Sequence, residues 1–227
     1  YAEFGPTDGV PMVLVHGGGI TSRMWGGFAP EAAAAGFHVF TPDTRNHGAT
    51  DNPSGKFTYD LAAGDLAGCI AALKLDHPVV MGYSDGGMIV EKFLLANPAT
   101  PQAAIIWGMT SKVAETPHYF AGMQAYYGYD KSGALPDAAL DALVKASPDF
   151  VARLQMLHAT ATEPDRWRTL HKLAWPVWTT PLELPLADFS KVNVPFLLIL
   201  GQDDEFSVPK DALALAQAFP NGEIAII

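Results

Sequence analysis

The chain has 227 residues, of which 49% are hydrophobic and 17% charged, and its net charge at pH 7 is −10. This length accommodates one large α/β domain with a well-filled core, and the apolar content excludes a disordered chain. The acidic balance, without any basic stripe, argues against nucleic acid and against an anionic membrane surface as partners. No apolar run approaches the ~20 residues of a membrane span. The single cysteine, Cys69, fits a reducing compartment, so the expected location is cytoplasmic. Composition does not indicate an oligomeric state.

Short apolar runs alternate along the chain with longer amphipathic segments. Residues 1–9 are predicted to be the end of a strand and a turn. Further strands are predicted at residues 12–15, 37–41, 79–81, 103–107, 195–200 and 224–227. Helices are predicted at 22–35 with Ser22 as N-cap, at 58–73 with Thr58 as N-cap, at 87–96 and at 209–219. Apolar strands that alternate with helices indicate an α/β fold, with a mostly parallel sheet and helices on both faces.

The pattern changes between residues 110 and 190. Prolines and aromatic residues are frequent there, no strand-like run is visible, and residues 137–145 and 148–158 are predicted to be helical. The segment is too apolar for a disordered linker, and a structureless loop of this length is uncommon in a compact domain. We therefore expect a core formed by residues 1–110 and 191–227, with residues 111–190 inserted as a helical cap.

The most informative motif follows the predicted strand at 79–81. It is Gly82-Tyr83-Ser84-Asp85-Gly86, which fits the pattern G-x-S-x-G and leads into an apolar-periodic run that Asn97-Pro98 ends. A strand, a sharp turn and a helix are the context in which this pattern presents a serine nucleophile. The flanking glycines avoid collisions with the neighbouring strand and helix. Ser84 would then lie at a helix N-terminus, where free N–H groups favour negative charge.

Three more motifs follow the ends of predicted strands. They are His16-Gly17-Gly18-Gly19, Asp43-x-Arg45-x-His47-Gly48 and Gly201-Gln202-Asp203-Asp204. Together with the serine motif, and in this order, they make the chain similar to the α/β-hydrolase superfamily, in its capped serine esterase, lactonase and C–C hydrolase branch. The resemblance runs from about Val10 to the end of the chain and implies an α/β-hydrolase fold.

The resemblance implies a role for four residues. Ser84 would be the nucleophile, and the backbone N–H groups of Gly18 and Asp85 would form the oxyanion hole. Such donors are worth on the order of 3 kcal/mol each in the transition state. The spacing G-x-x-D selects Asp204 as the triad acid, with Asp203 as its nearest rival. The side chain of Asp85 is expected to point away, because a carboxylate facing the oxyanion would oppose the hole.

The remaining polar residues of these motifs are expected to be structural. We expect His16 to hold the glycine loop, and Asp43 and Arg45 to support the loop after their strand. His47 is an outside candidate for lining the pocket. Asn46 stands where the family usually has glycine, and asparagine tolerates the left-handed geometry of such a turn.

The histidine that the triad requires is missing from its expected place. In the family it follows the strand that begins here at Ile224, and the chain ends at Ile227. We expect the histidine to lie beyond residue 227 of a longer protein; the alternative is a member without its general base. A substitute base from the cap would have to come within hydrogen-bond reach of Ser84, and the candidates are His118, His158 and His171.

The leading functional hypothesis is a serine hydrolase that cleaves a small, largely apolar carboxylic ester or lactone through an acyl-enzyme on Ser84. C–C bond hydrolysis and cofactor-free perhydrolysis use the same serine turn and stay open. A non-catalytic ligand-binding protein is the alternative from another class. No cofactor is expected, and no metal, because no His, Cys or Asp cluster has ligand spacing.

Overall fold

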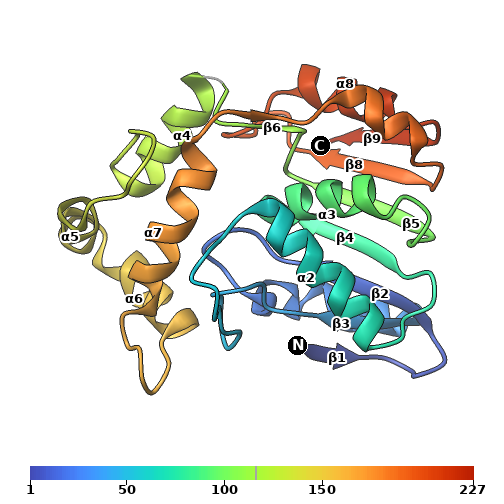
Figure 1. Ribbon diagram of the computed structural model, residues 1–227, viewed down its shortest axis with the longest axis horizontal. Coiled ribbons are helices and arrows are strands. Elements are labelled where there is room, and N and C mark those ends of the chain that lie inside the picture. The colour runs from blue at the N-terminus through green and yellow to red at the C-terminus, as the bar shows by residue number, and fades with distance from the viewer. Residues whose placement is uncertain (116) are drawn as a thin grey trace.

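The computed structural model of the protein describes residues 1–115 and 117–227 (Figure 1). Seven strands form one sheet in the order β1-β3-β2-β4-β5-β8-β9. β1 pairs antiparallel with β3, and the other pairs of this sheet are parallel. The predicted α/β class is therefore confirmed. The strands are β1 (Ala2–Phe4), β2 (Val10–Val15), β3 (Phe37–Thr41), β4 (Val79–Tyr83), β5 (Ala103–Trp107), β8 (Phe196–Leu200) and β9 (Gly222–Ile226).

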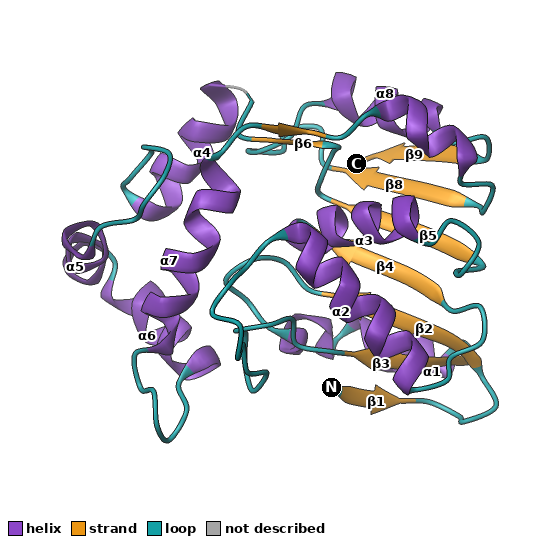
Figure 2. Cartoon of the chain, viewed as in Figure 1, coloured by secondary structure: helices purple, strands orange, loops and turns teal. Residues whose placement is uncertain are grey.

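Helices cover both faces of the sheet (Figure 2). One face packs against α2 (Tyr59–Ala72), α3 (Asp85–Ala96) and α8 (Pro209–Ala218). The other packs against α1 (Phe28–Ala34) and the short 3-10 helix η1 (Ser22–Gly26). A second 3-10 helix, η2 (Leu186–Lys191), contacts α8.

The side chains of β2 pack against the helices on both faces of the sheet. Val13 and Val15 belong to the cluster under α2 and α3, whereas Met12 and Leu14 pack with Trp25 on the α1 side. Successive side chains of a strand point to opposite faces, so a strand buried on both sides must be apolar throughout. Because β2, β3, β4, β5, β8 and β9 pair in parallel, their carboxyl ends lie at one edge of the sheet, from which the loops with the predicted site residues emerge.

Four helices form a separate layer beyond that edge of the sheet (Figure 1). This helical layer consists of α4 (Pro117–Tyr127), α5 (Asp137–Ala146), α6 (Pro148–His158) and α7 (Arg166–Thr179). Two short strands, β6 (Lys112–Val113) and β7 (Leu182–Glu183), pair antiparallel where the chain enters and leaves the layer. The expected boundaries of the inserted cap, residues 111 and 190, stay a prediction.

Several predicted elements differ from those observed. The helix expected at 22–35 is divided into η1 and α1, and Ser22 donates its backbone N–H to Asp43 instead of capping a helix. Thr58 does cap α2, by accepting a hydrogen bond from the backbone of Leu61 at 3.1 Å. The last strand begins at Gly222, two residues before its predicted start. Among the described residues, no helix is both long and apolar enough to cross a membrane.

Candidate active site

Ser84 occupies a strained turn between β4 and α3. Its backbone angles are φ 52° and ψ −120°, a combination that non-glycine residues rarely adopt and that is concentrated at functional sites. A methyl group on Gly82 would collide with the carbonyl of Gly86, and one on Gly86 would collide with the carbonyl of Val15. The two glycines therefore allow the strand, the turn and the helix to approach as closely as they do, as the sequence motif predicts.

The glycine loop after β2 lies against this turn. A methyl group on Gly17 would lie 3.2 Å from Cβ of Ser84, and one on Gly18 would collide with the carboxylate of Asp85. Both glycines line the same cavity as Ser84. The structure therefore brings together the two segments that are predicted to supply the nucleophile and the oxyanion donors.

Two core histidines hold this loop. The Nδ1–H of His16 donates to the carbonyl of Gly17 at 2.8 Å, and its Nε2 accepts the backbone N–H of Thr44 at 3.0 Å. Nε2 of His47 accepts the backbone N–H of Gly19 at 3.2 Å. Burial lowers the pKa of His16 to about 4 and that of His47 well below its usual range. Both imidazoles are therefore neutral near pH 7, and their bonds agree with the structural role expected for His16.

His47 is not among the residues that line the cavity, contrary to its sequence-based candidacy; its ring instead contacts the backbone of the glycine loop at Gly19. Asp43 and Arg45 have the supporting contacts expected of them. Asp43 accepts backbone N–H groups from Ser22 and Ala49, and Arg45 forms a two-pronged ion pair with Asp65 at 2.6 and 2.8 Å.

The side chain of Asp85 does not point away from the site, so that expectation is wrong. Asp85 is buried and is one of the residues that line the cavity, and its Oδ2 lies where it would collide with a methyl group on Gly18. The carboxylate accepts hydrogen bonds from the hydroxyl of Tyr59 at 2.8 Å and from the indole N–H of Trp178 in α7. Burial raises the pKa of Asp85 to about 6, and the two hydrogen bonds oppose that rise. Neither partner is close to Asp85 in sequence, so the sequence holds no signal for this contact.

The acidic residues in the loop after β8 differ in their solvent exposure. Asp203 and Glu205 are exposed, whereas Asp204 is partly buried. Oδ1 of Asp204 accepts the backbone N–H groups of Phe206 and Ser207 at 2.9 and 2.8 Å. Its Oδ2 lies 3.8 Å from where a methyl group on Gly108 would be, and Gly108 lines the same cavity as Ser84. One oxygen is thus held by the loop, while the other lies near a glycine that lines the cavity.

The three histidines of the helical layer that were candidates for a substitute base form hydrogen bonds away from Ser84. Nε2–H of His118 donates to the backbone carbonyl of Asp204 at 2.5 Å, and Nδ1–H of His171 donates to Trp167 at 2.7 Å. His158 contacts Gly19 and Gly48 through its two ring nitrogens. Among the described residues, none of these imidazoles is hydrogen-bonded to Ser84, and none lines the cavity.

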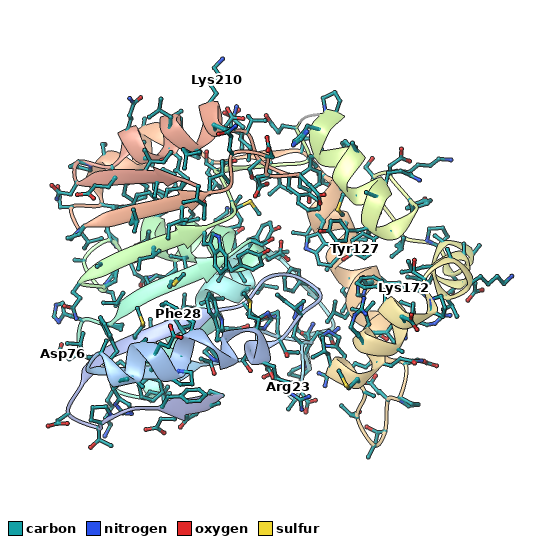
Figure 3. The ribbon with its side chains drawn as sticks, turned by 180° about the vertical axis from the view of Figure 1, so that it is seen from behind. Arg23, Phe28, Asp76, Tyr127, Lys172 and Lys210 are labelled. Carbon is teal, nitrogen blue, oxygen red and sulfur yellow. The ribbon has the colours of Figure 1, made fainter. Side chains whose placement is uncertain are left out.

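A cavity of about 230 Å³ separates Ser84 from the helical layer. Figure 3 shows Tyr127 on the side of that layer that faces the sheet, where it lines the cavity. Apart from the glycine loop, Ser84 and Asp85, the lining is mainly aromatic and aliphatic and includes Tyr83, Met109, Tyr119, Met123, Tyr126, Tyr127, Phe150, Leu154, Trp178 and Phe206. Such a space suits a small apolar ligand. The described residues contain no group of three or more His, Cys, Asp or Glu side chains that could hold a metal ion.

The fold, the strained serine turn and the cavity beside it define an α/β protein of the hydrolase type. The model of the alpha/beta hydrolase family matches residues 12–227, so the chain belongs to that family. A relative from Mycobacterium tuberculosis that is named as a non-heme bromoperoxidase, BpoC, is 27% identical over 225 residues, which cover 94% of this chain and 83% of the relative.

Solved structures of the same fold carry other activities in their names. The enol-lactonase of Burkholderia xenovorans superposes with a TM-score of 0.71 at 20% identity and covers 100% of this chain and 86% of its own. An esterase of Exiguobacterium antarcticum has a TM-score of 0.73 at 19% identity and covers 99% and 85%. At these identities the likeness shows the fold alone.

Proposed function

We propose that the protein is a serine hydrolase for a small, largely apolar carboxylic ester or lactone. The observation that carries the proposal is the position of Ser84, at φ 52° on a strained turn that opens into an aromatic cavity of about 230 Å³. Strain of this kind persists only where the surrounding structure enforces it, which is typical of a catalytic residue. In this proposal the helical layer acts as the cap that closes the cavity.

The geometry supports one set of roles. Oγ of Ser84 attacks the carbonyl carbon, and the backbone N–H groups of Gly18 and Asp85 receive the charge that develops on the carbonyl oxygen. Because a carboxylate beside the hole opposes this charge, the proposal requires that the hydrogen bonds from Tyr59 and Trp178 hold the carboxylate of Asp85 away from the carbonyl oxygen. The C–O bond to the leaving group then breaks, and water hydrolyses the acyl-enzyme. The free side of Asp204 orients the imidazole that moves the proton. Among the described residues no imidazole is hydrogen-bonded to Ser84, so the histidine of this step is a requirement of the proposal.

Cofactor-free perhydrolysis is the second candidate, because the relative that covers most of this chain is named as a non-heme bromoperoxidase. On the same serine, hydrogen peroxide would replace water as the acceptor of the acyl group, giving a peracid instead of a carboxylic acid. Peracid release from acetate or an acetyl ester in the presence of peroxide distinguishes this reaction from hydrolysis.

The experiment compares the protein with its Ser84→Ala variant on short-chain aryl esters and aliphatic lactones. We expect turnover that falls by at least 10³-fold in the variant, because the acyl-enzyme cannot form. Ser190→Ala is the matched control, since this serine is exposed and its hydroxyl donates to the nearby carbonyl of Ala187. Turnover that survives in Ser84→Ala would remove the nucleophile assignment. Ligand binding without any turnover in the parent would favour a non-catalytic protein.

A further inference from the structure

The glycine loop is held at three consecutive peptide groups, each by a different imidazole. The carbonyl of Gly17 accepts from His16, the N–H of Gly19 donates to His47, and the carbonyl of Gly19 accepts from His158. These bonds belong to the Gly17–Gly18, Gly18–Gly19 and Gly19–Ile20 peptides in turn. His16 and His47 come from the α/β core, but His158 is the last residue of α6 in the helical layer.

The two hydrogen bonds of His158 determine which tautomer its imidazole adopts. Its side chain is fully buried, at 0% exposure. Nε2–H donates to the carbonyl of Gly19 at 3.0 Å, and Nδ1 accepts the backbone N–H of Gly48 at 3.1 Å. A carbonyl only accepts and an amide N–H only donates, so these partners select a single neutral tautomer. His158 thus joins the glycine loop to the loop after β3.

The held peptides determine where the N–H of Gly18 points. In a trans peptide the carbonyl and the N–H lie in one plane and point in opposite directions, so the bond from His16 to the carbonyl of Gly17 also orients the N–H of Gly18. Gly19 has φ +67°, a region open to glycine because it lacks a side chain. Glycine has more accessible backbone conformations than other residues. Hydrogen bonds from His47 to the N–H and from His158 to the carbonyl of Gly19 therefore help to hold the loop in one conformation.

We propose that His158 is a positioning residue for the oxyanion hole: the helical layer, when docked, sets the donor at Gly18 through the bond from His158 to Gly19. This inference rests on the proposed function for the role of Gly18. It predicts that a substrate can bind without this bond, but that the oxygen of the reacting carbonyl is then poorly stabilised in the transition state.

A second buried residue of the layer provides a control. Arg166 in α7 is 2% exposed and donates to the carbonyls of Gly48, at 3.2 Å, and of Thr50. It therefore connects the layer to the same core loop as His158, but among the described residues it forms no hydrogen bond with the glycine loop. An effect of general docking should appear in both residues, whereas an effect on the oxyanion donor should appear only in His158.

The experiment measures kcat and KM for an aryl ester in the full-length protein. In His158→Phe we expect kcat to fall 10- to 100-fold with KM changed by less than about threefold, because a displaced donor weakens the transition state and not the ground state. His158→Gln keeps an N–H near the position of Nε2 and should recover most of kcat. His158→Asn keeps only the acceptor toward Gly48 and should resemble Phe. In Arg166→Met we expect kcat within about threefold of the parent.

Amide hydrogen exchange over residues 16–20 tests the same contact without turnover. We expect exchange at least tenfold faster in His158→Phe and His158→Asn than in the parent, and parental exchange in His158→Gln and Arg166→Met. Equal exchange in His158→Phe and the parent, or an equal loss of kcat in Arg166→Met, would overturn the inference. If the parent shows no turnover that depends on Ser84, the proposed function fails and exchange alone decides the role of His158.

Discussion

A buried carboxyl group in α3 permits a quantitative test of the structure. Glu91 is 0% exposed, and neither of its side-chain oxygens has a hydrogen-bond partner among the described residues. Burial raises its pKa from the ordinary value of 4.5 to about 8. The folded protein therefore keeps the proton of Glu91 at pH values where the unfolded chain has lost it.

The sign of the effect on stability follows from proton linkage. Between pH 4.5 and about 8 the native state binds the extra proton, so the free energy of unfolding decreases as the pH rises. Each pH unit corresponds to 1.36 kcal/mol, and a pKa raised from 4.5 to about 8 therefore costs about 5 kcal/mol at high pH. This figure is the upper end for Glu91, because a relaxing structure or entering water lowers it.

The perturbation is Glu91→Gln, which keeps the shape and a buried polar group but cannot ionise. We expect the parent and the variant to be about equally stable near pH 4, where both side chains are neutral. The variant should become more stable by about 1 kcal/mol per unit up to pH 8, with no further gain above it.

Urea denaturation at a series of pH values measures this difference directly. Glu223→Gln is the control, since this glutamate is exposed on β9. The reasoning fails if the difference between Glu91→Gln and the parent does not change with pH, or if the variant is less stable at pH 8.

Three further outcomes follow from the site. Asp204→Asn should lower kcat more than Asp203→Asn, because only Asp204 is partly buried beside the cavity; the reverse order in steady-state kinetics would exchange their roles. Gly86→Ala should destabilise the protein by several kcal/mol, because the new methyl group collides with the carbonyl of Val15. Gly64→Ala, in open space on α2, should stabilise it by about 0.5–1 kcal/mol. Melting curves that rank the two variants in the opposite order would contradict this prediction. Trp178→Phe should raise the pKa of Asp85, because the indole N–H favours the carboxylate; carboxyl NMR that finds it unchanged or lowered would show that the bond is not formed.

The sequence determined most of the α/β core, because its signals are local. A strand buried on both faces must be apolar throughout, and Thr58 caps the helix that it precedes. The two glycines around Ser84 likewise indicate a tight turn through their own lack of side chains. The sequence does not predict α4 and α7 individually. Their frequent aromatic residues, and Pro176 inside α7, leave no clear helical spacing of apolar and polar residues.

The packing of elements that are far apart in the sequence brings the polar groups of the site together. The carboxylate of Asp85 turned toward the cavity because Tyr59 and Trp178 converge on it from α2 and α7, 26 and 93 residues away in sequence. His158 reaches Gly19 across 139 residues. A buried polar residue needs a hydrogen-bond partner, and the sequence shows which residues are polar. It does not show which partner each residue finds, because the packing of whole helices and strands determines that partner.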